Sequence, residues 1–266
     1  MSSRITQKFE ELRLKNQKAL ITYVTAGDPN CETTEKLVYA MEGAGADIIE
    51  LGIAYSDPLA DGPVIQRAAS RALANGVNID VVFQLVKKIR GNTQVPLAFL
   101  LYYNSIFRYG IEKFISKCKE TGVDGLIIPD LPLEERGEFK KVLEGKNIDL
   151  IPLVAPTSEE RIKDVVKDAS GFVYCVSSMG VTGTRTSFDE NIETFMNKVK
   201  NHTEVPLAIG FGISDVQGIR QLKGYAQGLI VGSAIIKMIE EGMVSGKVVE
   251  MVTEFVKELK DSLLKD

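Results

Sequence analysis

The feature that most constrains the fold of this chain is a regular alternation of short apolar runs with longer amphipathic stretches. Most of the apolar runs are continuous and do not alternate with polar residues. This is typical of strands that are covered on both faces, as in parallel sheets. The stretches between them have the apolar spacing of helices. The alternation therefore predicts an α/β protein built on a parallel sheet.

The expected elements follow the chain from one end to the other. Strands are expected at 20–25, 47–53, 97–102, 124–129, 149–154, 171–176, 207–210 and 228–232. Helices are expected at 33–44, 64–74, 78–90, 107–120, 134–145, 158–168, 189–201, 215–223, 233–241 and 246–263. A short amphipathic helix, with Ile5, Phe9, Leu12 and Leu14 on one side, is expected before the first strand.

Eight strand–helix units in 266 residues predict a closed eight-stranded parallel (β/α)8 TIM barrel with an extra N-terminal helix. The alternative is an open doubly wound sheet, which usually carries a G-x-G-x-x-G turn after its first strand. Here the first strand runs into TAGDP at 25–29, which lacks that spacing. No stretch has the composition of a linker, so we expect residues 1–266 to form one domain.

Composition excludes several classes of function. The net charge is −4 and no long basic run exists, so we expect no nucleic-acid partner. The apolar runs are far shorter than the roughly 20 residues of a membrane span. The N-terminus has no apolar signal region, and the three cysteines are widely spaced, so we expect a cytoplasmic protein with reduced thiols. His202, the only histidine, reads as a helix end, so no histidine triad or multi-histidine metal site is expected.

In a (β/α)8 barrel the active site lies at the carboxyl ends of the strands. Glu50 lies within the apolar run DIIELGI, where an unpartnered carboxylate would be costly. Strand alternation places Ile48, Glu50 and Gly52 on one face, which we expect to be the barrel interior, with Gly52 leaving space above the carboxyl group. Glu50 is then either a site residue or a buried acid satisfied by a basic side chain or by backbone donors.

The next loop, SDPLADGPVIQRA at 56–68, contains Asp61 just before a helix that begins with Pro63. In isolation Asp61 reads as a turn or cap residue. It follows the strand that carries Glu50, however, and paired carboxylates over one pocket are an acid–base arrangement. Burial is expected to raise the pKa of Glu50, whereas Asp61 in its polar loop is expected to stay ionised.

Three glycine-rich turns follow the late strands, at 177–185, 210–214 and 231–235. Backbone N–H groups in such turns, with a helix that opens at Ser233, suit a bound phosphate group. Barrels commonly bind phosphate with the loops after strands seven and eight. The alternative is that these glycines only supply positive φ angles.

Together these motifs resemble one family. The stretches concerned are TAGDP (25–29), ELGIAYSDPLADGPVIQRA (50–68), YYNSIFRYG (102–110), GVDGLIIPDLP (122–132), PLVAPTSEERI (152–162), GVTGTR (180–185), GFGIS (210–214) and GSAIIK (232–237). In order along the whole chain, they look like the tryptophan synthase α subunit. This family cleaves indole-3-glycerol phosphate into indole and glyceraldehyde 3-phosphate.

The resemblance implies roles for individual residues. Glu50 and Asp61 match the catalytic glutamate and aspartate, and Thr182 lies in the loop that closes over the site. The phosphate-binding positions are Gly183, Gly212, Gly232 and Ser233. The positions at or near the indole pocket are Tyr23, Leu101, Tyr103, Ile127, Tyr174 and Phe211.

The resemblance also implies a partner. The family pairs with a β subunit in an αββα assembly, and segment 54–62 helps to signal to it. No metal or cofactor is implied in this chain, because pyridoxal phosphate belongs to the β subunit. The chain departs from the family at Ala54 and Ser105, usually proline, and at Ser178–Met179. Alternatives from the residues alone are a stand-alone indole-releasing lyase, a phosphosugar isomerase and a non-catalytic regulatory barrel.

Overall fold

The computed structural model describes residues 2–58, 60–176, 192–210 and 212–265. The strands in these ranges are β1 (Ala19–Thr25), β2 (Ile48–Gly52), β3 (Leu97–Leu100), β4 (Gly125–Ile127), β5 (Asp149–Ile151), β6 (Leu153–Val154), β7 (Val173–Val176), β8 (Leu207–Gly210) and β9 (Gly228–Val231). All neighbours are parallel, in the order β5-β4-β3-β2-β1-β9-β8-β7-β6.

The barrel closes through the fifth expected strand, 149–154. Its first half, β5, pairs with β4, and its second half, β6, pairs with β7. Pro152 divides the two halves, because proline has no N–H to donate to a ladder. Its carbonyl oxygen still accepts a hydrogen bond from the Tyr174 N–H at 2.9 Å. The prediction of a closed eight-stranded barrel is therefore confirmed, with the fifth strand divided in two.

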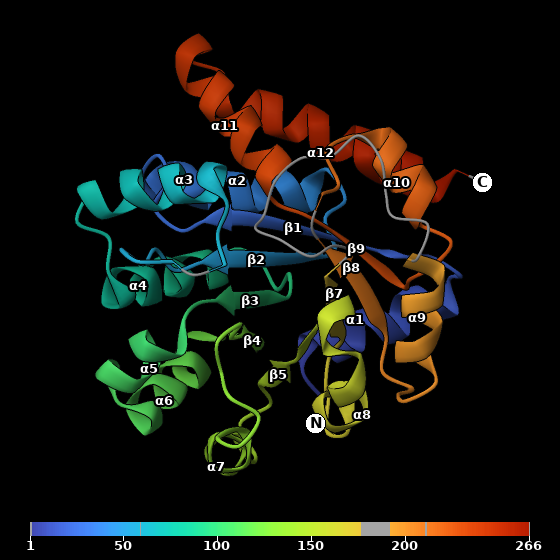
Figure 1. Cartoon of the computed structure of the whole chain (residues 1–266). Coiled ribbons are helices and arrows are strands. Elements are labelled where there is room, and N and C mark those ends of the chain that lie inside the picture. The colour runs from blue at the N-terminus through green and yellow to red at the C-terminus, as the bar shows by residue number, and fades with distance from the viewer. Residues whose placement is uncertain (1, 59, 177–191, 211, 266) are drawn as a thin grey trace.

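Helices surround the strands (Figure 1). They are α1 (Arg4–Leu14), α2 (Cys31–Gly43), α3 (Pro63–Ala74), α4 (Ile79–Arg90), α5 (Tyr103–Tyr109), α6 (Ile111–Thr121), α7 (Arg136–Leu143), α8 (Ile162–Val166), α9 (Ile192–Lys200), α10 (Val216–Leu222), α11 (Ser233–Ser245) and α12 (Val248–Leu264). Two expected helices differ. Gly110, with φ of 92°, separates α5 from α6, and a 3-10 helix at Pro156–Arg161 precedes α8.

The strands separate two apolar layers, because their side chains alternate between the two faces. On β2, Ile49 and Leu51 pack in the layer between strands and helices. Ile48 packs inside the barrel in a second cluster, which includes Ile127 of β4. This alternation sends the side chain of Glu50 into the barrel interior, as the sequence predicts.

Helix α1 closes the N-terminal end of the barrel. Its buried residues Ile5 and Phe9 belong to the interior cluster. Leu14, expected on the same side, is exposed at the last residue of the helix. A Cβ atom on Gly125, the first residue of β4, would lie 2.6 Å from Ile5 Cδ1, so glycine lets the helix approach closely. The Arg4 guanidinium is 2.7 Å from Asp124 Oδ1. With this end filled, the carboxyl ends of the strands are left to form a site.

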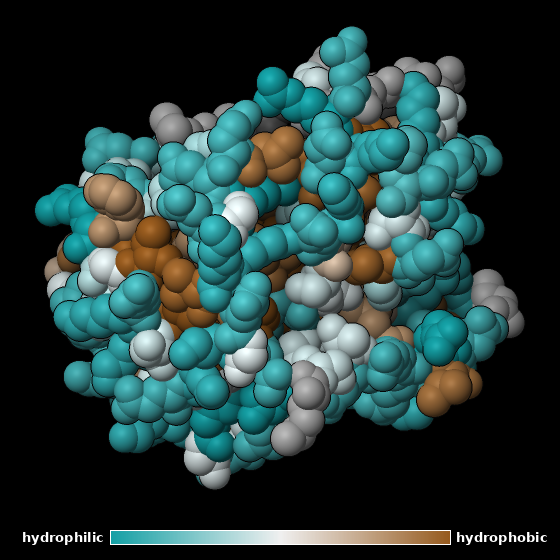
Figure 2. Space-filling model, turned by 90° about the horizontal axis from the view of Figure 1, so that it is seen from below, coloured by the Kyte–Doolittle hydropathy of each residue, from teal (hydrophilic) through white to brown (hydrophobic). Residues whose placement is uncertain are grey.

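The surface seen from below is mostly hydrophilic, and hydrophobic side chains form small, separate patches on it (Figure 2). Among the described helices, none has the length and apolar character needed to cross a membrane.

Candidate active site

A pocket opens at the carboxyl ends of the strands, opposite α1. Strands β1, β2, β3, β6, β7 and β9 each contribute a side chain to it, so segments far apart in the sequence meet there. Its lining consists of Tyr23, Glu50, Ala60, Asp61, Ile65, Leu100, Pro129, Leu153, Tyr174, Gly212, Ile213, Ile230, Gly232 and Ser233. The two predicted carboxylates and part of the predicted phosphate site thus share one pocket.

Glu50 is the most unusual group in this pocket. Its side chain is completely buried, and neither carboxyl oxygen has a hydrogen-bond partner among the described residues. Burial raises the pKa of Glu50 to about 8, because the charged form would lose its hydration without compensation. The alternative of a buried acid satisfied by a basic side chain or by backbone donors is therefore not supported. Glu50 is a carboxyl group that keeps its proton near neutral pH.

Asp61 lies in the loop between β2 and α3, close to the hydroxyl group of Tyr102. That hydroxyl accepts a hydrogen bond from the Ala60 N–H at 2.9 Å and donates one to the Asp61 carboxylate. Burial raises the pKa of Asp61, and the bond from Tyr102 opposes this shift. Because the two effects oppose each other, the expectation that Asp61 stays ionised remains a prediction.

Two buried tyrosines form flat walls beside Glu50. The Tyr23 hydroxyl lies 3.2 Å from Thr25 Oγ1. A Cβ atom on Gly52 would lie 2.6 Å from Tyr23 Cζ, and one on Gly210 would lie 2.6 Å from Tyr174 Cζ. The space that the sequence predicts above Glu50 is therefore filled by the Tyr23 ring. Glycines on neighbouring strands make room for aromatic walls, which suit a planar aromatic ligand.

Another part of the pocket lining, after β8 and β9, is polar backbone. Gly212 has a φ of 92°, a conformation that favours glycine. Gly232 precedes α11, and no side chain among the described residues caps the N-terminus of this helix. Ser233 is the first residue of α11 and, like Gly212 and Gly232, lines the pocket. A helix N-terminus with free N–H groups favours an anion, so this side suits a phosphate group.

Three predicted indole-pocket residues lie elsewhere. Leu101 is buried in the layer under the helices, and Tyr103 stacks edge-on against Phe139 of α7. Ile127 lies inside the barrel but does not line the pocket. Residues 97–103 are apolar or aromatic throughout, so the sequence pattern does not reveal which face each residue takes. Leu100 and Tyr102 occupy the site side instead.

The remaining predicted residues Thr182, Gly183 and Phe211 lie outside the described residues. Sequence reasoning missed Leu100, Tyr102 and Pro129. For Leu100 a signal existed, because it lies two residues after Ala98, which packs inside the barrel, so the strand period points it the same way. No local pattern marks Tyr102, since its role depends on the loop at Ala60.

The histidine and the cysteines do not line this pocket. His202 is exposed just after α9, as expected, and Cys118 and Cys175 are buried free thiols. Within the described ranges, no group of three or more His, Cys, Asp or Glu side chains is arranged to hold a metal ion.

A parallel (β/α)8 barrel with a protonated carboxyl group at its mouth, beside aromatic walls and an uncapped helix N-terminus, defines an enzyme of the barrel class. The family model for the tryptophan synthase alpha chain matches residues 9–264. The alpha chain of Alkaliphilus metalliredigens is 58% identical over 259 residues, covering 97% of each chain. That of Thermoanaerobacter sp. (strain X514) is 52% identical over 98% of this chain and 100% of its own.

Solved structures agree. The tryptophan synthase of Mycobacterium tuberculosis has a chain with a TM-score of 0.90 and 33% identity, with full coverage of both chains. The alpha chain of Legionella pneumophila has a TM-score of 0.90 and 32% identity, covering 99% of this chain and 98% of its own. The chain belongs to the tryptophan synthase alpha chain family. It is the lyase component that cleaves indole-3-glycerol phosphate, and it works with a β subunit.

Proposed function

We propose that Glu50 carries out the proton transfers of the retro-aldol cleavage. Neutral when substrate binds, Glu50 protonates C3 of the indole ring. The C3–C3′ bond then breaks, and the resulting carboxylate accepts the proton of the C3′ hydroxyl group as the aldehyde forms. One proton leaves Glu50 and one returns, so the enzyme is regenerated. The observation that carries this proposal is a fully buried carboxyl group with no hydrogen-bond partner in the described chain and a pKa of about 8.

Asp61 acts in the same step on the other side of the ring. As a carboxylate it accepts a hydrogen bond from the indole N–H and stabilises positive charge that develops on the ring. The Tyr102 hydroxyl holds this carboxylate in place by a hydrogen bond. Tyr23 and Tyr174, which line the pocket, flank the planar ring.

The phosphate group binds at the glycine-rich side. Backbone N–H groups near Gly212, Gly232 and Ser233 hold it, at the start of α11. By sequence resemblance, Gly183 belongs to this set and Thr182 to the closing loop. Binding energy from the phosphate positions the reacting bond between the two carboxylates.

The partner geometry and cofactor use are part of the same proposal. The chain and the β subunit form an αββα assembly in the cytoplasm through segments 54–62 and 102–110, and indole passes to the β subunit. Phe107, in α5 within the second segment, is 67% exposed, which supports a contact surface there. This chain, as one domain, uses no cofactor, and pyridoxal phosphate acts only in the β subunit.

The test is to supply indole-3-glycerol phosphate and follow indole release with and without a β subunit. We expect slow release by the chain alone and faster release once the β subunit is added. Absence of indole in both conditions would contradict the proposal. Equal rates, with no complex in sedimentation, would instead support a stand-alone lyase, with Ala54 and Ser105 as the first positions to examine.

A further inference from the structure

Helices α3 and α11 approach the pocket from the same side. Asp61 and Gly62 immediately precede α3, and Gly232 precedes α11. The two helices pack against each other, α11 lying across α3 (Figure 1). One helix therefore follows the loop that holds Asp61, and the other begins at the phosphate side of the pocket.

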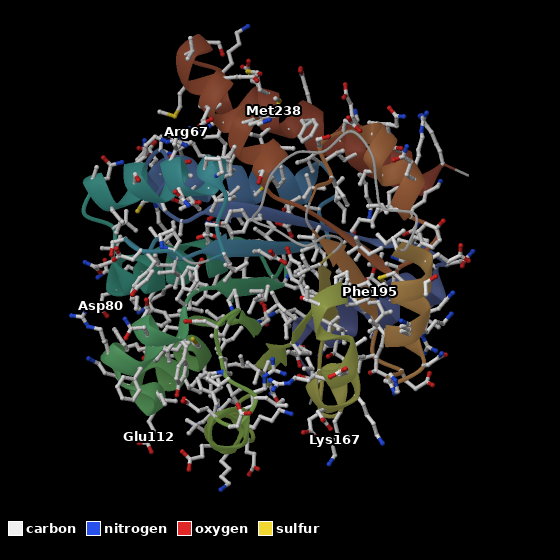
Figure 3. The ribbon with its side chains drawn as sticks, viewed as in Figure 1. Arg67, Asp80, Glu112, Lys167, Phe195 and Met238 are labelled. Atoms are coloured by element: carbon white, nitrogen blue, oxygen red, sulfur yellow. The ribbon has the colours of Figure 1, made fainter. Side chains whose placement is uncertain are left out.

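An arginine joins these two helices and the loop after β1. Arg71 of α3 donates from Nε to Asp28 Oδ1 at 2.7 Å and from Nη2 to Asp28 Oδ2 at 2.9 Å. Its Nη1 donates to Glu240 Oε1 of α11 at 2.8 Å. Arg67, one turn earlier, binds both oxygens of Glu240 and lies between the two helix ribbons (Figure 3). We call Asp28, Arg71 and Glu240 the helix clamp.

The clamp is more than a surface ion pair. The side chain of Asp28 has no exposed area, and those of Arg71 and Glu240 are about three-quarters buried, at 25% and 23% exposed. Bidentate bonding from a planar guanidinium fixes direction as well as distance. A lysine at position 71 would keep the charge but could not hold both carboxylates in this geometry.

We propose that Arg71 is a positioning residue for the cleavage reaction. It fixes the position of Asp61 relative to the phosphate side of the pocket at Gly232 and Ser233. This inference rests on the function proposed above. Arg71 lies eight residues into α3, about 12 Å from the start of the helix at 1.5 Å per residue. Because a helix is stiff over this length, a small tilt at the clamp shifts its N-terminal end and the carboxylate that precedes it. Displacement by about 1 Å can cost up to about 100-fold in rate.

The central variant is Arg71→Lys, in the full chain with its β subunit. We expect kcat to fall about tenfold or more. The inhibition constant of glycerol 3-phosphate, which probes the phosphate side alone, should stay within about twofold. Lys260→Met is the matched control, since Lys260 forms a largely buried ion pair with Asp47 at 2.6 Å, next to the N-terminal end of β2. It should lower thermal stability without changing kcat. Glu240→Gln should weaken the helix clamp less than Arg71→Lys does. It is the test variant to use if Arg71→Lys does not fold.

A double variant separates this inference from the proposed function. If Arg71 acts through Asp61, adding Arg71→Lys to Asp61→Asn should reduce kcat by much less than it does in the wild-type chain. Unchanged kcat in a folded Arg71→Lys or Glu240→Gln chain would overturn the inference, as would equal losses in kcat and in glycerol phosphate affinity. Full activity of Asp61→Asn would instead overturn the proposed role of Asp61.

Discussion

The acidic residues at the two ends of the barrel differ in their partners. At the N-terminal end, buried Asp124 receives hydrogen bonds from Arg4 and Arg90 at 2.7 and 2.6 Å. Buried Asp149 receives them from Ser3 and Thr6. At the carboxyl end, Glu50 is equally buried and receives none from the described residues.

The difference separates two uses of a carboxylate within one fold. A buried carboxylate that is paired on all sides holds elements together, here α1 against the strands β4 and β5. An unpaired one destabilises the fold, because it must keep its proton or lose its hydration. A buried group that lowers the stability of the fold and holds no elements together is expected to have a functional role. The predictions below test whether the two ends separate in this way.

The largest effect is expected for Glu50→Gln. Glutamine keeps the shape of the side chain but cannot transfer a proton, so single-turnover indole release should fall by about 10²–10⁴-fold. Binding of glycerol 3-phosphate and the circular dichroism spectrum should be unchanged. Retention of more than about a tenth of the wild-type rate is incompatible with general-acid catalysis of this size, and Glu50 would then be abandoned as the proton donor.

At the other end, Asp124→Ala should affect stability and leave catalysis intact. The change leaves Arg90, whose side chain is 9% exposed, without its carboxylate partner. Breaking such a buried pair costs about 3–5 kcal/mol of unfolding free energy, measured by urea denaturation. The kcat of the folded enzyme should match wild type. A large loss of kcat with normal stability would show that the two ends are not separate in function.

The pH dependence of stability should also distinguish Glu50. Its pKa rises from 4.5 in the unfolded chain to about 8 in the folded one. Between these values the folded state keeps a proton that the unfolded state loses. The contribution of Glu50 to the free energy of unfolding is therefore greatest below pH 4.5 and is lost as pH rises through 8. The loss is at most about 1.4 kcal/mol per pH unit.

The measurement is the unfolding free energy of wild type minus that of Glu50→Gln, from pH 5 to pH 8. This difference should fall steadily as pH rises, because the other titrating groups are common to both proteins. A flat difference would mean that Glu50 is ionised in the folded state and has a partner.

The smallest effect is expected at the phosphate side. Gly212→Val obstructs backbone approach and strains a φ of 92°, so the KM should rise about tenfold, as for loss of one hydrogen bond to a charged group. Gly76→Val, at a φ of 73° after α3 and with nothing within 4 Å of an added Cβ, is the matched control. It should lower stability and leave KM unchanged. If both variants leave KM unchanged while folded, the Gly212 turn does not contact substrate.

The side-chain faces of a strand follow from its local sequence pattern. Strand alternation placed Glu50 inside the barrel, because a period of two applies along β2 from Ile48 to Gly52. The same period stops at the end of β3, at Leu100. Beyond that residue the chain turns into α5 and the period no longer applies. Leu100 therefore lines the pocket, whereas Leu101 and Tyr103 do not.

The sequence by itself determined the parallel barrel, the N-terminal helix and the strand face of Glu50, since each depends on hydrophobic spacing between neighbours in the chain. Only the tertiary structure decided which groups surround each carboxylate. The hydrogen bond from Tyr102 to Asp61 and the contact of Arg71 with Asp28 each join segments that are tens of residues apart. Glu50 has no hydrogen-bond partner among the described residues, near or distant in the chain. The physical reason is that a carboxylate's proton affinity depends on charges, donors and water within a few ångströms in space, whatever their distance along the chain.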